Sequence, residues 1–200
     1  MKRLPDSAHT SHPWRIHELT PDFRVEDVWQ LRAPGRSDDR DTAAELLVSL
    51  DPARSSSVLV RALFAMRWKI GGLLGWDAPE TGLGSRVPTL RERLPADLRD
   101  TAAPQLRALP FTSLYMTEDE FAAEIANGTM HGVMHIGIVA DAAGGHTGQM
   151  AVLVKPNGPL GVAYMAAIKP FRHLLVYPPM LRELERSWQA RADARAAAPG

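Results

Sequence analysis

The stretch MHGVMHIGIVADAAGGHTGQMAVLVK (130–155) decides the fold of this chain. Two runs rich in β-branched residues, 130–139 and 147–155, flank the glycine-containing turn DAAGGH. Apolar runs on either side of a glycine turn are typical of a β-hairpin. We therefore predict two long antiparallel strands at the centre of the chain.

The segment that follows the hairpin, PLGVAYMAAIKPFRHLLVYPPML (159–181), predicts a long C-terminal helix that runs to about Ala196. Pro159 suits the first turn of a helix. Pro170 should kink the helix, and Pro178-Pro179 should kink or break it. An antiparallel sheet with segregated helices belongs to the α+β class.

Segments before the hairpin supply further elements. Residues 23–31 read as a strand with a bulge, and residues 111–116 alternate well enough for another strand. Thr117 and Glu120 form a capping-box pattern, which predicts a short helix over 118–126 that ends at Asn127-Gly128.

The middle of the chain divides into a helical part and a proline-rich part. A short helical block is expected over 42–50, and Asp51-Pro52 begins the clearest helix of the chain. Residues 77–110 contain prolines at five positions and read as a surface excursion with one helical turn near 90–94. The apolar face of the central helix includes Leu59, Leu63, Met66, Ile70, Leu73 and Leu74, with Arg61 opposite.

The domain organisation is expected to be simple. Residues 1–16 are polar and aperiodic and read as a mobile N-terminal arm, residues 17–196 as a single domain, and residues 197–200 as a disordered tail. The N-terminal segment lacks the apolar core of a secretory signal, and no long uninterrupted apolar run predicts stable membrane insertion.

Composition excludes several classes of function. The 200 residues include 23 Lys and Arg, 23 Asp and Glu, and no cysteine. A neutral chain does not favour nucleic acid as a partner. The absence of cysteine removes disulfides, thiolate metal sites and cysteine nucleophiles, and is compatible with a cytoplasmic location. The excess of arginine over lysine favours a bacterial source. No cofactor is expected, and the oligomeric state stays open.

His131 and His135 resemble a metal-binding pair at helical spacing, but their neighbours predict a strand. Four residues of strand span roughly 13 Å, too far for two imidazoles to share one zinc ion. We therefore expect no metal site. The two histidines should line or rim the sheet face that also carries Val133 and Val139.

Other motifs read as ordinary structure. GLGSR (82–86) and GGHTG (144–148) neither follow a strand nor open a helix, so they favour turns over a phosphate site. Ser55-Ser56-Ser57 lacks the glycines and partners of a serine nucleophile. Arg67-Trp68-Lys69 favours a helix edge with solvated cations over a basic-aromatic binding patch.

Three segments resemble a known family: ALFAMRWKIGGLLGW (62–76), LYMTEDEFAAEIANGTMHGVMHIGIV (114–139) and VKPNGPLGVAYMAAIKPFRHLLVYPPML (154–181). They are similar to the bacterial family called domain of unknown function 2867 (DUF2867). That family in turn resembles the SRPBCC, START-like and Bet v 1-like superfamily. The resemblance implies a helix-grip fold, in which a curved antiparallel sheet wraps around a long kinked C-terminal helix.

The resemblance implies an apolar cavity between sheet and helix, which suits a small hydrophobic molecule. A carrier-like binder is the first hypothesis. The first alternative is a cyclase- or dehydratase-type enzyme acting on a polyketide- or lipid-like substrate, and the second is an interaction or peripheral membrane module that uses 159–181. No catalytic residue can be assigned. The candidate ligand-binding residues are Tyr115, His131, His135, Gln149, Tyr164 and Phe171.

Overall fold

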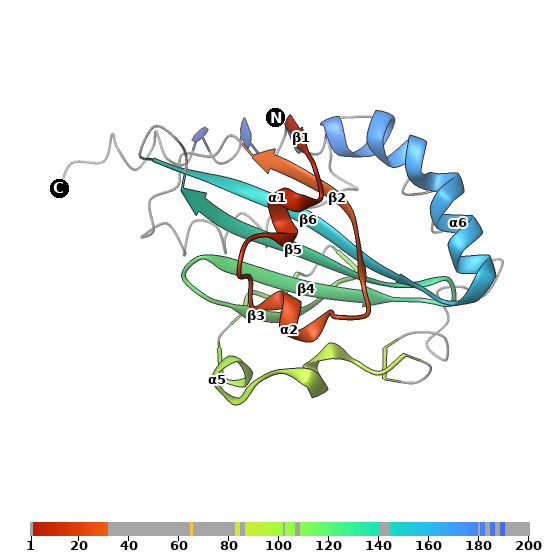
Figure 1. Cartoon of the computed structure of the whole chain (residues 1–200), viewed down its shortest axis with the longest axis horizontal. Coiled ribbons are helices and arrows are strands. Elements are labelled where there is room, and N and C mark those ends of the chain that lie inside the picture. Colours follow the sequence, from red (N-terminus) through yellow and green to blue (C-terminus); the bar gives the residue numbers. More distant parts are fainter. Residues whose placement is uncertain are drawn as a thin grey trace.

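The fold is built on one curved antiparallel sheet of six strands in the order β1-β2-β6-β5-β4-β3 (Figure 1). The computed structural model describes residues 2–31, 65, 83–84, 87–101, 103–106, 109–140, 145–179, 181–182, 185–186 and 189–190. The strands are β1 (Lys2–Leu4), β2 (Arg24–Leu31), β3 (Thr112–Met116), β4 (Glu120–Ala126), β5 (Met130–Ala140) and β6 (His146–Pro156).

The predicted hairpin is confirmed as β5 and β6, the two longest strands at 11 residues each. They pair antiparallel, with His135 opposite Ala151. The predicted strand over 23–31 is also confirmed as β2, which has an irregularity in register between Val25 and Asp27. The strand predicted over 111–116 is β3, and the helical turn near 90–94 is η3 (Leu90–Arg93).

The short helix predicted over 118–126 is wrong, because these residues form β4 between β3 and β5. The capping-box contact itself does form, with the backbone N–H of Glu120 donating to Thr117 Oγ1 at 3.1 Å. Here it closes the turn between two strands. Pairing on both edges satisfies the backbone of β4, and this tertiary pairing overrides the local helix signal.

One face of the sheet, here called the arm face, carries Val133, His135, Ala151 and Leu153, and the N-terminal segment covers it. Figure 1 shows α1 (Ser7–Thr10) and α2 (Ile16–Leu19) in front of the sheet. Residues 1–16 therefore differ from the predicted mobile arm. Buried apolar side chains hold this N-terminal segment in place. A second segment on the same face contains α5 (Ala96–Arg99). The buried apolar side chains that cover the arm face are Trp14, Ile16, Leu19, Leu90, Leu94 and Leu98.

Trp14 lies flat on the arm face because β5 has a glycine beneath it. A Cβ atom on Gly137 would overlap the Trp14 ring. The backbone of β5 thus comes close to the indole, which is 2% exposed. This contact fixes the N-terminal segment directly above the histidines of β5.

The opposite face, here called the helix face, carries Met134, Ile136, Met150 and Val152 and belongs to a separate apolar cluster. Tyr177 and Leu181 of the C-terminal segment pack into this cluster. The predicted C-terminal helix begins as α6 (Gly158–Phe171), with Pro159 in its first turn.

Pro170 lies inside α6, and the next turn, η4 (Arg172–Val176), has π-helical geometry. A proline removes one backbone donor, and the wider turn accommodates the disturbance. The predicted break at Pro178-Pro179 is not seen, because helical structure continues through 177–179 and 181–182.

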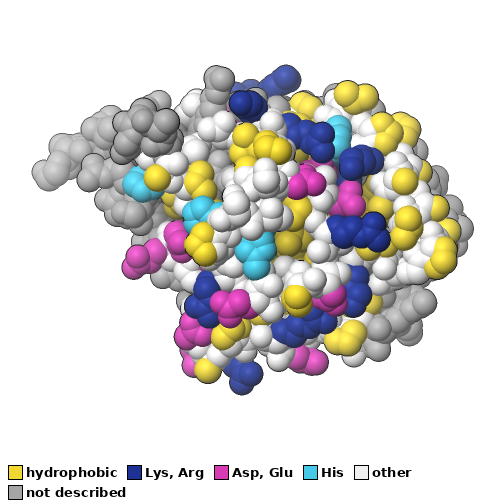
Figure 2. Space-filling view, in the orientation of Figure 1, with side chains coloured by type: hydrophobic (Ala, Val, Ile, Leu, Met, Phe, Trp, Pro, Cys, Tyr) yellow, Lys and Arg dark blue, Asp and Glu magenta, His cyan; other side chains and the backbone are white. Residues whose placement is uncertain are grey.

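Most of α6 packs loosely, and Figure 2 shows hydrophobic side chains along it at the surface. Tyr164 and Ile168 are half-buried, whereas Phe171 is 55% exposed. Phe171, one of the candidate ligand-binding residues, therefore does not pack against the sheet. Its place at the end of α6, just before the π-helical turn, directs it outward. The helical block over 42–50 and the central helix with Leu63, Met66 and Arg67 lie outside the described residues.

Candidate functional site

Four of the six predicted ligand-binding side chains gather on the arm face. Tyr115, His135 and Gln149 are at most 3% exposed, and so is His131. Strand alternation places these side chains on one face, as the sequence predicts for the two histidines. Tyr164 and Phe171 lie on α6, outside the arm face.

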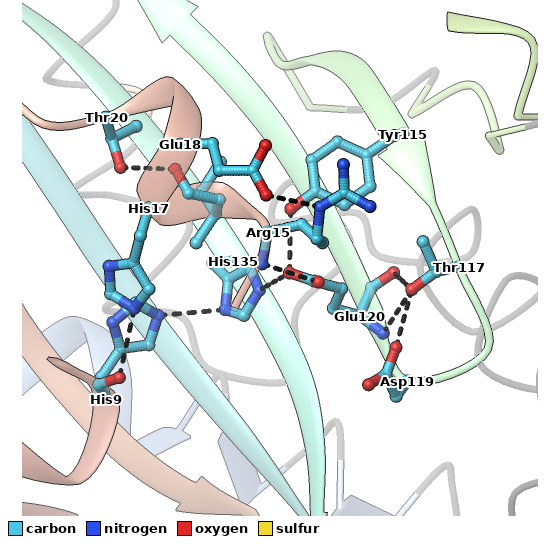
Figure 3. A network of polar contacts seen from close by, with 11 residues as sticks. His9, Arg15, His17, Glu18, Thr20, Tyr115, Thr117, Asp119, Glu120 and His135 are labelled. Atoms are coloured by element: carbon cyan, nitrogen blue, oxygen red, sulfur yellow. Dashed lines mark hydrogen bonds and ion pairs between the residues drawn. The ribbon is translucent and has the colours of Figure 1, made fainter. Parts of the chain in front are cut away.

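Glu120 is the centre of the first polar network on the arm face (Figure 3). Its Oε2 atom accepts hydrogen bonds from Tyr115 Oη and His135 Nε2, both at 2.9 Å. Its Oε1 atom accepts the backbone N–H of Arg15 at 2.9 Å. Both carboxylate oxygens are therefore bonded, one of them to the N-terminal segment.

His9 extends this network from α1. Its Nε2 lies 3.2 Å from His135 Nδ1, and the side chain is fully buried. Since His135 Nε2 donates to Glu120, His135 Nδ1 is the acceptor and His9 Nε2 the donor when both rings are neutral. The ring of His17 is 4.9 Å from that of His9, centre to centre. The Glu120 network, meaning Tyr115, Glu120, His135 and His9, thus ties the N-terminal segment to the sheet.

The surroundings favour neutral imidazoles in this network. Burial, with His135 beside it, lowers the pKa of His9 to about 3. Burial also lowers the pKa of His135, although Glu120 opposes the shift. Burial acts to raise the pKa of Glu120, but His135 and the hydrogen bonds from the Arg15 backbone and Tyr115 together outweigh it, and the net pKa is lowered. Burial beside Glu120 raises the pKa of Tyr115.

A second carboxylate–histidine pair lies further along the same strands. Glu124 Oε2 accepts from His131 Nε2 at 2.8 Å and from the backbone N–H of Leu90 at 3.0 Å. The hydroxyl of Thr89 donates to Glu124 Oε1. Both carboxylate oxygens of Glu124 are therefore bonded, and Thr89 and Leu90 attach the 87–98 segment to the sheet.

Sequence reasoning placed neither Glu120 nor Glu124 among the candidate site residues, although a signal existed. Glu120 and Glu124 share the four-residue spacing of His131 and His135, and adjacent antiparallel strands would align the two pairs. Interpreting 118–126 as a helix hid this alignment.

Every oxygen of the Glu120 and Glu124 carboxylates is bonded inside the fold. The two carboxylate–histidine pairs therefore stabilise the packing of the two segments that cover the arm face.

A small open pocket lies beyond the Glu120 network. It has a volume of about 390 Å³ and is lined by His12, Glu118, Asp119, Ile138, Ala140 and His146. None of the six predicted ligand-binding residues lines it. Within the described parts of the chain, no three histidine or acidic side chains are arranged to hold a metal ion.

The helix face carries a different polar group, here called the Asp27 cluster: Asp27, Trp29, Arg172, His173 and Tyr177. The irregularity in β2 gives Asp27 the same orientation as Val152, its partner on β6. His173 Nε2 contacts Asp27 Oδ1, and Arg172 Nη2 lies 3.4 Å from Asp27 Oδ2. Asp27 is fully buried.

Aromatic rings surround this carboxylate. The Trp29 ring lies 6.4 Å from that of His173 and 5.8 Å from that of Tyr177, both in edge-to-face geometry. Burial raises the pKa of the Tyr177 phenol, and the neighbouring Asp27 carboxylate raises it further. The cluster thus joins β2 to the C-terminal helix.

The Asp27 cluster is incompletely hydrogen-bonded. Among the described residues, Asp27 Oδ2, Trp29 Nε1 and two guanidinium nitrogens of Arg172, Nε and Nη2, are buried without a hydrogen-bond partner. Unbonded buried atoms also occur on the arm face and the segment that covers it, at His9 Nδ1, His12 Nδ1, Trp14 Nε1 and Gln149 Oε1, but none of these belongs to a carboxylate or a guanidinium group. Charged groups left unbonded in a protein interior are the more costly case.

Residues 19–179 match a family described as "Protein of unknown function (DUF2867)". The chain belongs to this family. The DUF2867 match spans the Asp27 cluster and both glutamates of the arm face, but His9 and Trp14 precede it. No curated protein and no solved structure matches the chain. Within the described residues of this DUF2867 protein, no helix has the length and apolar character needed to cross a membrane.

Proposed function

We propose that this DUF2867 protein binds a small hydrophobic molecule between the helix face of the sheet and the C-terminal helix. The observation that carries the proposal is the Asp27 cluster, a set of buried charged and polar groups with free hydrogen-bonding atoms beside an apolar surface. Binding sites for small molecules combine a mostly apolar lining with a few placed polar groups.

The apolar part of the site would come from the helix face. Met134, Ile136 and Met150 are buried there next to Trp29. Methionine side chains are flexible and adapt to ligands of varied shape. A curved antiparallel sheet followed by a C-terminal helix also supports the helix-grip plan that we propose for this chain. In this proposal the ligand lies against the methionines with its polar end at Asp27.

Native mass spectrometry of the full chain, purified under mild conditions, tests this proposal. We expect an added mass of a small organic molecule, which is released when the protein is denatured. The matched variant is Met150→Glu on the helix face, compared with Gln149→Glu on the arm face. Loss of the added mass only in Met150→Glu supports the site, and equal retention in both folded variants contradicts it.

A second candidate function, an enzyme acting on such a molecule, is favoured by the Asp27–His173 pair. A buried carboxylate that holds one imidazole nitrogen leaves the other as a proton acceptor. His173 is partly exposed, whereas His131 and His135 are enclosed in bonded networks. This candidate predicts that the bound molecule changes mass during incubation with the wild type and does not change with His173→Gln.

A further inference from the structure

We infer that the polar end of the ligand is an anionic hydrogen-bond acceptor, a carboxylate, and that Arg172 and Trp29 bind it. This inference rests on the proposed function and adds the chemical class of the ligand. It is carried by the kind of atoms that the Asp27 cluster leaves unbonded.

Three of the four unbonded buried atoms in the cluster are nitrogens that carry hydrogen: Trp29 Nε1, Arg172 Nε and Arg172 Nη2. The fourth, Asp27 Oδ2, lies 3.4 Å from Arg172 Nη2, so these two atoms form an ion pair with each other, and Trp29 Nε1 and Arg172 Nε are the donors left over. The cluster therefore lacks acceptors rather than donors. An indole N–H and a guanidinium can only donate. A ligand that completes the cluster must bring acceptor atoms.

The charge around the cluster favours an anion. Glu26 lies 3.7 Å from Lys169 and 3.6 Å from Arg172, and Arg3 lies 3.8 Å from Asp27. These described ion pairs join three cations to two carboxylates, so one positive charge is left over when His173 is not counted. One ligand carboxylate balances this excess, and guanidinium groups bind carboxylates with paired hydrogen bonds.

The apolar surroundings select the rest of the ligand. Trp29 and Tyr177 belong to the apolar cluster of the helix face, so the donor atoms of the Asp27 cluster adjoin hydrocarbon side chains. The ligand class is therefore a hydrophobic monocarboxylic acid, with its chain along Met134 and Met150. A neutral alcohol would use the apolar surface without balancing Arg172.

Calorimetric titration of the delipidated full chain at pH 7 with decanoate, decanol and decylamine tests the inference. We expect decanoate to bind about tenfold or more tightly than decanol, the range of a charge-assisted hydrogen bond, and decylamine to bind weakest. Arg172→Met should remove this preference, and Arg172→Lys should restore part of it. Trp29→Phe, which removes the N–H together with the pyrrole part of the indole ring, should weaken decanoate binding about threefold to tenfold relative to decanol binding.

Two control variants match these changes. Trp14→Phe alters a buried tryptophan of the arm face, and Arg182→Met removes an exposed cation from the C-terminal segment. Neither should change decanoate affinity. If Arg172→Met does not fold, Trp29→Phe alone decides between the outcomes.

Equal affinity for decanoate and decanol, or a neutral molecule found bound in the purified protein, would overturn the inference and leave the proposed function standing. Failure of all three compounds to bind, together with the absence of any co-purified molecule, would contradict the proposed function and the inference with it.

Discussion

Each face of the sheet buries a carboxylate against a histidine, but the two carboxylates differ in how completely they are hydrogen-bonded. On the arm face, Glu120 has both oxygens bonded, to His135, Tyr115 and the N-terminal backbone. On the helix face, Asp27 has one oxygen without a hydrogen bond, and Arg172 beside it has unbonded nitrogens. Burial of a carboxylate–histidine pair therefore does not identify a functional site. The incomplete bonding of charged groups separates a site that awaits a partner from one that holds the fold together.

The largest effect should come from removing residues 1–19, which contribute Trp14, Ile16 and Leu19 to the arm face. Each of these buried side chains stabilises the fold by about 3 kcal/mol or more, and their joint loss approaches the whole stability of a domain. We expect no cooperative unfolding transition in urea. A sharp transition at the wild-type midpoint would mean that the arm face needs no cover and that its network is not structural.

Glu120→Gln and Asp27→Asn compare the two carboxylates directly. Glu120→Gln disrupts a fully bonded buried pair and should lower the free energy of unfolding by about 3 kcal/mol. Asp27→Asn should cost less than about 1.5 kcal/mol, because Arg172 keeps Glu26 as an ion-pair partner at 3.6 Å and an asparagine oxygen can still accept a hydrogen bond from His173. Urea denaturation measures both. A larger loss for Asp27→Asn would reverse the roles that we give to the two faces.

The pH dependence of stability should follow the arm face. The pKa of His9 is about 3 in the folded chain and about 6.5 when unfolded, so the unfolded state binds more protons between these values. Stability is therefore complete above pH 6.5 and falls as the pH drops toward 3, with a loss of about 2 kcal/mol at pH 5 from this group. His135, whose pKa is also lowered, adds to the fall in the same direction.

His9→Gln is the variant that sharpens this measurement, and His146→Gln, at an exposed histidine, is its control. Chemical denaturation at a series of pH values should give a flatter profile below pH 6.5 for His9→Gln and an unchanged slope for His146→Gln. An unchanged slope in both variants would mean that His9 does not contribute to the pH dependence of stability.

The sequence predicted the strands with strong alternation and missed what depends on pairing. Two parts of the sheet could be predicted because their apolar residues repeat at a period of two. These are the strand at Phe23–Leu31, with its bulge, and the hairpin of β5 and β6. The strand at Glu120–Ala126 could not be predicted, because Thr117 and Glu120 form a local hydrogen bond that serves a helix cap and a strand turn equally well. His9 could not be placed at all, since a lone histidine among polar residues shows no periodicity and its partner lies 126 positions away.

The candidate site shows the same division. Strand alternation placed His131 and His135 on one face, but which face meets the C-terminal helix depends on tertiary packing. Asp27 became inward-facing on the helix side only through the bulge in β2. Its partner His173 lies in the π-helical turn that follows Pro170. Neither the bulge in β2 nor the π-helical turn leaves a periodic pattern of residues in the sequence.

The smallest effects should come from α6. Leu160 is 63% exposed and Leu174, in the following turn, is 73% exposed, so Leu160→Ser and Leu174→Ser should change stability by less than about 0.5 kcal/mol. With the ligand held on the helix face, the wild type should not float with anionic phospholipid vesicles, and decanoate affinity should be the same in both variants. If the wild type floats and these two variants do not, residues 159–181 act as a membrane or partner surface. The functional surface would then be the outer side of α6. The Asp27 cluster, like the Glu120 network, would serve only to stabilise the fold.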